Sequence, residues 1–177
     1  LLFQTQKLQG KLLMLKDLKK IAIIVAHPDD EALGMGGSLL KLKELGVEIN
    51  ILFCTDGISS RHCCDESKKK RAEEFKQAMQ FLSPSFYKSL NYPDNMMDSV
   101  NLLEIIKNVE EFIEGCKPDS VFTHFSCDLN IDHRRVFQAV STACRAGSST
   151  FVKNILCFEV LSSTNLKLEN RRFTPNF

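Results

Sequence analysis

The sequence lacks both a long hydrophobic run and an excess of either charge. No stretch reaches the ~18 consecutive apolar residues that a membrane-spanning helix requires, so no membrane span is expected. The 23 Lys and Arg residues nearly balance the 22 Asp and Glu residues, which leaves a net charge of +1. This balance gives no reason to expect a nucleic-acid partner, and we expect none. The first twenty residues carry five scattered lysines and do not resemble a secretory signal, so we expect a cytoplasmic protein.

Cysteine pairs suited to a disulfide framework or a structural zinc site are also lacking. The chain has seven cysteines, an odd number, and none of them lies in a Cys-x-x-Cys motif. We therefore interpret them as reduced thiols, several of them buried. The glycines of Gly34-Met35-Gly36-Gly37 permit close backbone packing, but their spacing is not G-x-G-x-x-G, so the sequence gives little support for nucleotide binding.

Short apolar runs alternate with amphipathic segments along the chain. The pattern predicts strands at 21–26, 47–54, 86–90, 120–123 and 155–160, and helices at 31–45, 67–82, 100–114 and 134–145. Such alternation is typical of an α/β fold, here a three-layer, Rossmann-like domain with a mainly parallel sheet. In the common strand order 3-2-1-4-5, ligands bind beyond the carboxyl ends of the first and fourth strands, where the order reverses.

Histidines and carboxylates follow both of those strands directly. The first group is His27, Asp29, Asp30 and Glu31, and the second is His124, Asp128, Asp132 and His133. An imidazole and a carboxylate from the first loop, with an imidazole from the second, would give three metal ligands and leave a position open for water. That arrangement is typical of a catalytic zinc ion, because structural zinc sites normally have four protein ligands. The adjacent pair of aspartates in an extended loop would let one bind the metal while the other faces the substrate.

These motifs resemble the LmbE/PIG-L family of zinc-dependent N-acetylglucosaminyl de-N-acetylases. The resemblance lies in Ala26-His27-Pro28-Asp29-Asp30-Glu31, in Thr123-His124 and in Asp128-Leu129-Asn130-Ile131-Asp132-His133-Arg134. Shorter segments are also similar, namely Thr55-Asp56-Gly57, Tyr92-Pro93-Asp94-Asn95 and Glu159-Val160-Leu161-Ser162-Ser163-Thr164.

The resemblance implies a role for each matching residue. His27, Asp30 and His133 would bind Zn²⁺, and Asp29 would be the general base in hydrolysis of an N-acetyl group on an N-acetylglucosamine-type sugar or glycoconjugate. The implied partner is a small amino-sugar substrate, and the family resemblance also allows a homo-oligomer. Residues 20–177 would form the deacetylase domain, with residues 1–19 as an N-terminal extension that need not all belong to the natural protein. The chain stops at Phe177 without an obvious closing element, which suggests that the full protein continues.

One position departs from the family pattern. Many members have a histidine three residues before the last ligand, where it is taken to stabilise the oxyanion, but this chain has Asn130. Asn130 could donate an amide hydrogen bond instead, and His124 is the other catalytic candidate. Asp132 is expected to orient a ligand or cap the following helix rather than bind the metal. Arg61 and Arg71 could contact a sugar or phosphate, although isolated arginines are more often surface residues.

Two alternatives to the deacetylase remain open. The asparagine favours a zinc-containing sugar-binding or regulatory protein with weak or no turnover. A metal-dependent esterase or phosphoesterase is the other alternative, because activation of water by zinc does not specify which bond is cleaved.

Overall fold

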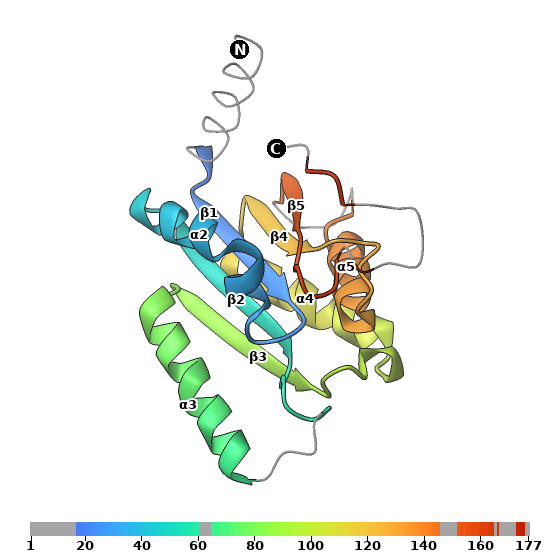
Figure 1. The fold of residues 1–177 in the computed structure, drawn as a ribbon. Helices are drawn as coiled ribbons and strands as arrows, with labels where there is room; N and C mark the ends of the chain where they lie inside the picture. Colours follow the sequence, from blue (N-terminus) through green and yellow to red (C-terminus); the bar gives the residue numbers. More distant parts are fainter. Residues whose placement is uncertain (1–16, 61–64, 146–151, 165, 167–172, 176–177) are drawn as a thin grey trace.

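The computed structural model describes residues 17–60, 65–145, 152–164, 166 and 173–175. Of the expected extension at residues 1–19, only residues 17–19 lie within these ranges. Arg61 lies outside them. In chain order the elements are β1 (Lys20–Val25), α2 (Asp30–Glu44), β2 (Glu48–Thr55), α3 (Asp65–Leu82), β3 (Phe86–Tyr92), η1 (Met97–Ser99), α4 (Leu102–Cys116), β4 (Ser120–His124), α5 (Ile131–Ala143) and β5 (Asn154–Phe158) (Figure 1).

The five strands form one sheet in the order β3-β2-β1-β4-β5, and each neighbouring pair is parallel. Helices α2 and α3 pack on one face of this sheet, and α4 and α5 pack on the other. The predicted three-layer α/β fold is therefore confirmed, together with its strand order. Because β1 and β4 are neighbours, their carboxyl ends bring the two groups of polar residues to the same edge of the sheet.

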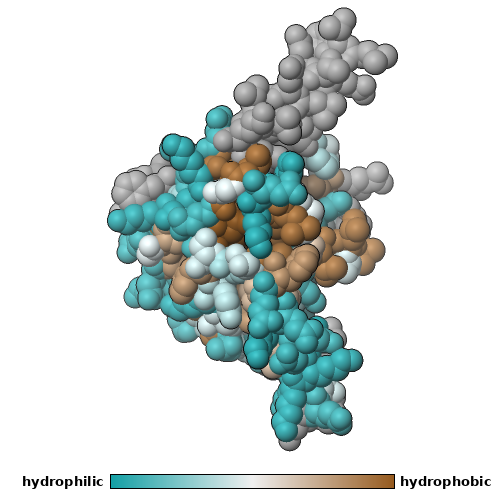
Figure 2. Space-filling model, turned by 90° about the vertical axis from the view of Figure 1, so that its left-hand side faces the viewer, coloured by the Kyte–Doolittle hydropathy of each residue, from teal (hydrophilic) through white to brown (hydrophobic). Residues whose placement is uncertain are grey.

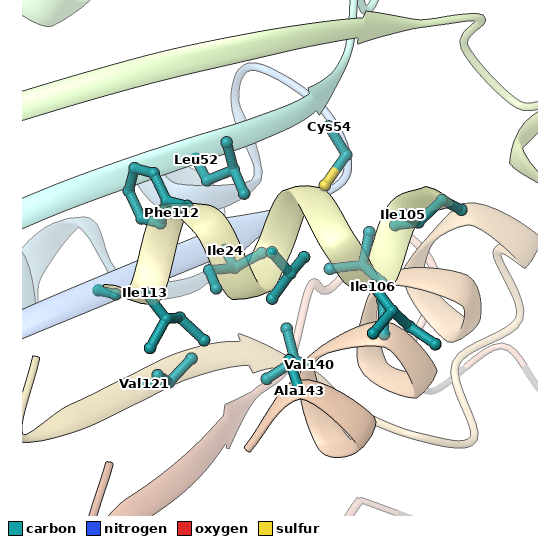
Figure 3. Close-up of a cluster of buried hydrophobic side chains, with 14 of the residues drawn as sticks. Ile24, Leu52, Cys54, Ile105, Ile106, Phe112, Ile113, Val121, Val140 and Ala143 are labelled. Atoms are coloured by element: carbon teal, nitrogen blue, oxygen red, sulfur yellow. The ribbon is translucent and has the colours of Figure 1, made fainter. Parts of the chain in front are cut away.

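Strand β1 is buried on both faces, as its continuous apolar sequence predicts. Ile21 and Ile23 point into the core beneath α2 and α3, whereas Ala22 and Ile24 point toward α4 and α5. Figure 3 shows the core on the α4 and α5 side of the sheet, in which side chains of these two helices meet those of β1, β2 and β4. A strand held between two apolar layers is a rigid support for the loop that follows it.

Most helix boundaries lie within two residues of the predicted ones, and α5 begins three residues earlier than predicted. Helix α4 continues two residues past the predicted end at position 114, to Cys116, and Lys117 takes the left-handed conformation (φ 49°) after it. Helix α5 begins at Ile131 rather than Arg134, because the side chain of Asn130 caps its first turn. His133 therefore lies within a helix and not in a loop.

Two glycines allow close contacts near the site. A Cβ atom at Gly34 would lie 2.3 Å from the ring of Phe158, so α2 can pass over the end of β5 only with glycine there. At Gly57 (φ 63°) a Cβ would lie 2.8 Å from Cδ of Pro28. Nothing lies within 4 Å of such an atom at Gly36 or Gly37, so close packing was predicted correctly only for Gly34.

Two expectations about the rest of the chain can be compared with the described residues. All five cysteines within them are free thiols, and Cys54 and Cys116 are buried, as predicted. No helix in the described part is both long and apolar enough to cross a membrane.

Candidate metal centre

Three side chains from the two predicted groups meet at the carboxyl edge of the sheet. Nδ1 of His27 lies 3.2 Å from Oδ2 of Asp30 and 3.3 Å from Nε2 of His133. The third separation, between His133 Nε2 and Asp30 Oδ2, is 3.4 Å. The three atoms thus form a nearly equilateral triangle that could hold one metal ion.

The size of the triangle fits a tetrahedral zinc ion. Ligand atoms at ~2.0–2.1 Å from a tetrahedral zinc are separated from one another by about 3.3 Å. Two imidazole nitrogens and a carboxylate oxygen are also the donor types of catalytic zinc sites. A polar cavity of about 240 Å³ adjoins the triangle and is lined by all three residues. The donor set therefore leaves one side of the site open to water and substrate.

The local backbone fixes the position of each residue of the triangle. His27 directly follows the buried residue Ala26, and Asp30 is the first residue of α2. The backbone N–H of His27 donates to Oδ2 of Asp30 at 2.8 Å, which closes the loop between them. On the other side, Oδ1 of Asn130 accepts from the backbone N–H groups of Asp132 (2.8 Å) and His133 (3.4 Å). The capping residue lies three positions before His133, so His133 lies in the capped first turn of α5.

Two carboxylates orient His27 from its far side. Oδ2 of Asp132 and Oδ1 of Asp94 each lie 3.1 Å from Nε2 of His27. Asp132 is completely buried and also accepts from the backbone N–H groups of Asn95 (2.6 Å) and Met97 (3.0 Å). It does not cap α5, because Asn130 does. Of the two roles predicted for Asp132, the orienting one is therefore found.

A second carboxylate arrangement orients His133. Oδ1 of Asp128 lies 3.3 Å from Nδ1 of His133, and the hydroxyl of Ser163 lies at the same distance from that nitrogen. The other oxygen of Asp128 accepts from the hydroxyl of Thr164 at 2.6 Å. A nitrogen bonded in this way carries the proton, which leaves Nε2 with a free lone pair for a metal.

The charges in the site shift several pKa values. Burial opposes protonation of His27, but its bonds to Asp132 and Asp30 outweigh burial and raise its pKa to about 10. Burial also opposes ionisation of Asp30, yet the neighbouring histidines hold the pKa of Asp30 far below its usual value. For Asp128, the bonds from His133 and Thr164 likewise outweigh burial and lower its pKa to about 2. The site thus favours anionic carboxylates around cationic or metal-bound imidazoles.

His124 lies behind the triangle, with its Nε2 3.4 Å from Oδ2 of Asp30, and does not line the cavity. The residue is fully buried, and its ring stacks on that of His133 with centroids 3.8 Å apart and planes 9° apart. Its Nε2 accepts from the backbone N–H of Ala26 at 2.9 Å. Burial lowers its pKa to about 3, so the ring is neutral. This position favours support of His133 and of the β1 end over the direct contact with a substrate that the sequence suggested.

Asp29 lines the cavity beside the triangle and is exposed. Its backbone has φ 138° and ψ −23°, a conformation that residues other than glycine rarely adopt. The sequence predicts an extended loop at this position, and the structure differs. The backbone N–H of Asp29 donates to Oε2 of Glu31 at 3.1 Å. Glu31 is only 2% exposed, and burial raises its pKa to about 7. Backbone strain of this kind is often found at functional sites.

Asn130 lines the same cavity, but both ends of its amide already have partners. Its oxygen caps α5, and its Nδ2 donates to Oδ1 of Asn95 at 3.0 Å. Because a side-chain amide has two N–H groups, this bond occupies only one of them.

Asp94, Asn95 and Ser163 belong to the site but were not predicted as site residues from the sequence. Asp94 is 4% exposed and follows β3 within two residues. The sequence did contain a signal for Asp94, because it is a carboxylate that follows the end of β3, as the predicted site residues follow the ends of β1 and β4. Ser163 lies beyond β5, in one of the segments that carried the family resemblance, and its sequence position alone did not suggest contact with His133.

The PIG-L family, described as GlcNAc-PI de-N-acetylase, matches residues 22–144, a range that contains all three atoms of the triangle. The chain belongs to this family. An uncharacterised deacetylase, YaiS of Escherichia coli, is 31% identical over 82% of this chain and 76% of its own length. The diacetylchitobiose deacetylase of Thermococcus kodakarensis is 29% identical over 79% of this chain but only 55% of its own.

A solved PIG-L relative has the same fold. The N,N'-diacetylchitobiose deacetylase of Pyrococcus horikoshii superimposes with a TM-score of 0.66 at 25% identity, over 82% of this chain and 62% of that one. The chain thus spans little more than half the length of the two chitobiose deacetylases. These matches place it among de-N-acetylases, which are amide hydrolases.

Proposed function

We propose that this PIG-L protein is a zinc-dependent hydrolase that removes the acetyl group from an N-acetylglucosamine-type sugar or glycoconjugate. The observation that carries this proposal is the triangle of His27 Nδ1, Asp30 Oδ2 and His133 Nε2, whose sides of 3.2, 3.3 and 3.4 Å suit one tetrahedral zinc ion. The similarity to two diacetylchitobiose deacetylases supports an acetamido sugar as substrate.

His27, Asp30 and His133 would hold the zinc ion. The chemistry that zinc supplies when bound is a lower pKa for water, about 7, and polarisation of the amide carbonyl. Asp132 and Asp128 keep the two imidazoles in the tautomers that binding requires. The polar cavity of about 240 Å³ is where the acetamido group would enter.

Asp29 is the proposed general base. Its carboxylate would take a proton from the attacking water and later give it to the nitrogen of the leaving amine, which makes the amine a better leaving group. The residue lines the cavity and is held by Glu31 in a fixed backbone conformation, so little reorganisation would be needed. Asn130 would donate its second amide hydrogen to the developing oxyanion.

The test is release of acetate and free amine from N-acetylglucosamine and diacetylchitobiose by zinc-loaded protein. Asp29→Asn should bind zinc as the wild type does and lose activity by about 10²–10⁴-fold. His133→Ala should lose both zinc and activity. Asp98→Asn, which removes an exposed carboxylate outside the site, is the matched control and should change neither. Zinc-loaded protein that releases no amine from any acetamido sugar would refute the proposal.

The amide of Asn130 favours one alternative, a zinc-containing sugar-binding protein with little turnover. Both ends of that amide are already bonded, to the start of α5 and to Asn95. Asn130→His separates the two functions. A large gain in activity would identify an impaired enzyme, and sugar binding without turnover in both forms would identify a binding protein. Comparison of acetamide, acetyl ester and phosphate ester substrates would test the esterase alternatives.

A further inference from the structure

Asn95 connects the two halves of the site through its backbone and through both ends of its side chain. It lies between β3 and η1 and lines the same cavity as the metal triangle. Its backbone N–H donates to Oδ2 of Asp132 at 2.6 Å, and its Nδ2 donates to Oδ1 of Asp94 at 3.0 Å. Its Oδ1 accepts from Nδ2 of Asn130 at 3.0 Å. One residue thus joins the segment after β3 to the start of α5.

The start of α5 fixes the direction of these side-chain bonds. Oδ1 of Asn130 accepts from the backbone N–H groups of Asp132 and His133, and a backbone N–H can only donate. Nδ2 of Asn130 is therefore the end of the amide that donates to Asn95, and the atom of Asn95 that it meets is the carbonyl oxygen. Nδ2 of Asn95 is then left to donate to the carboxylate of Asp94. The orientations of both amides follow from a helix cap and a carboxylate.

The helix cap alone does not fix the plane of the Asn130 amide. The terminal torsion of an asparagine side chain is broad, so an amide that is held only by its oxygen can still turn about that contact. The bond from Nδ2 to Asn95 is a second point of attachment, and two points fix the direction of the remaining N–H of Asn130. This is the N–H that would stabilise the oxyanion, and such donors are most effective when they need no reorganisation during the reaction.

Asn95 is itself held in place by its neighbours. Its φ of 54° lies in the left-handed region, which asparagine adopts more readily than most residues. Asp94, which accepts from its side chain, is 4% exposed, and Asp132, which accepts from its backbone, is completely buried. Both carboxylates also lie 3.1 Å from Nε2 of His27. The groups that support Asn95 are therefore the same groups that orient His27.

We propose that Asn95 is a positioning residue, which fixes the amide of Asn130 so that its second N–H can reach the oxyanion. The proposal rests on the proposed deacetylase function, because the oxyanion forms only during hydrolysis of the amide. Asn95 does not contact the reacting atoms and acts through Asn130. Its contribution is therefore made in the transition state and not in the binding of substrate.

Glycine is the substitution that removes only the side chain of Asn95. It adopts φ 54° without strain and keeps the backbone N–H that donates to Asp132. With zinc-loaded protein and N-acetylglucosamine as substrate, Asn95→Gly should lower kcat by about 10–100-fold and leave KM and the affinity for zinc unchanged. An unchanged kcat would overturn the proposal. A raised KM with an unchanged kcat would also overturn it, because Asn95 would then bind the substrate directly.

Asn91→Gly is the matched control. Asn91 is an exposed asparagine near the end of β3 with φ 56°, so the same substitution is made at nearly the same backbone conformation. Its side chain accepts from the hydroxyl of Ser89 and does not contact Asn130. We expect kcat, KM and the affinity for zinc to remain at the wild-type values in this variant.

A double variant tests whether Asn95 acts through Asn130. Asn130→Ser removes the amide donor but keeps the cap of α5, so the loss of the Asn95 side chain should have no further effect on kcat in that background. The double variant should therefore have the same kcat as Asn130→Ser alone. Losses that multiply in the double variant would show that the two residues act independently, and the proposal would fail.

Nuclear magnetic resonance tests the positioning without turnover. The side-chain amide signals of Asn130, identified by their absence in Asn130→Ser, should shift and exchange faster with water in Asn95→Gly but not in Asn91→Gly. The signals of Gln77, an exposed residue of α3, are the reference and should not move. Figure 2 shows the side of the molecule that carries α2 and α3, and its lower end, formed by α3, is mainly hydrophilic.

The two measurements distinguish the failure of this proposal from the failure of the proposed function. Unchanged Asn130 signals in Asn95→Gly would overturn the positioning role, even in an active deacetylase. Altered signals in a protein whose wild type releases no amine from any acetamido sugar would refute the deacetylase function, and would leave Asn95 as the residue that orients Asn130.

Discussion

Asp132 lies behind His27, with its Oδ2 3.1 Å from Nε2 of the imidazole, while Nδ1 on the opposite side of the ring faces Asp30 at 3.2 Å. The two residues are more than one hundred positions apart in the sequence, and Asp132 immediately precedes the proposed ligand His133. One turn of α5 therefore carries the proposed metal ligand His133 and also the carboxylate that lies against the other histidine. This arrangement couples the two loops of the site.

Removal of the Asp132 charge should weaken zinc binding. In Asp132→Asn the bond from His27 Nε2 loses its charged acceptor, and we expect the affinity for zinc to fall about 10–100-fold. Competition with a fluorescent chelator measures this change. Asp98→Asn removes an exposed carboxylate nearby in η1 and should leave the affinity unchanged. Equal zinc affinity in Asp132→Asn and wild type would show that the contact is not used.

Asp29→Gly should stabilise the protein while it inactivates the enzyme. Glycine adopts φ 138° without strain, and relief of strain of ~1–3 kcal/mol exceeds the entropic cost of glycine, about 0.5–1 kcal/mol. We expect the free energy of unfolding in urea to rise by about 1 kcal/mol. Asp98→Gly, a matched change in η1, should lower the free energy of unfolding. A loss of stability in Asp29→Gly would mean that the conformation of this loop is not strained.

Glu31 should make stability depend on pH between about 4.5 and 7. Burial raises its pKa from 4.5 to about 7, so the folded state holds more protons than the unfolded state in this range, and stability falls as the pH rises. Glu31→Gln removes the penalty and still offers an oxygen to the N–H of Asp29. The gain in free energy of unfolding should be near zero at pH 4 and up to about 3 kcal/mol at pH 8, at about 1.4 kcal/mol for each pH unit.

Urea titrations with a chelator present, at pH 4, 6 and 8, measure this difference. Glu44→Gln, at an exposed position of the same helix, is the control and should show no such trend. A gain in Glu31→Gln that does not grow with pH would indicate that Glu31 titrates normally in the folded protein.

Two variants of Asn130 separate its structural role from its catalytic one. Serine can replace the cap of α5, so Asn130→Ser should keep stability within about 0.5 kcal/mol, whereas Asn130→Ala should lose about 1 kcal/mol. If the amide also stabilises the oxyanion, both variants should lose activity by about 10²–10³-fold. Full activity in Asn130→Ser would restrict the residue to capping. Thermal unfolding and acetate release give the two readouts.

The sequence by itself determined the fold class and the ends of the sheet where the site lies. Apolar runs such as Ile21 to Ala26 predict strands buried on both faces, and such strands require helices on both sides. The order of strands and helices then places the residues after β1 and β4 together. The family resemblance added the assignment of His27, Asp30 and His133, which the structure brings within 3.4 Å of one another.

Only the tertiary structure decided what surrounds those ligands. That Asp94 faces His27, that Ser163 faces His133 and that His124 is stacked behind the site depend on how separate strand ends and loops pack. Local sequence patterns report the period of a helix or strand, which is a property of neighbours along the chain. They carry no information on contacts between side chains that are distant along the chain, and the contacts of Asp94 and Asp132 with His27 and of Ser163 with His133 are of this kind.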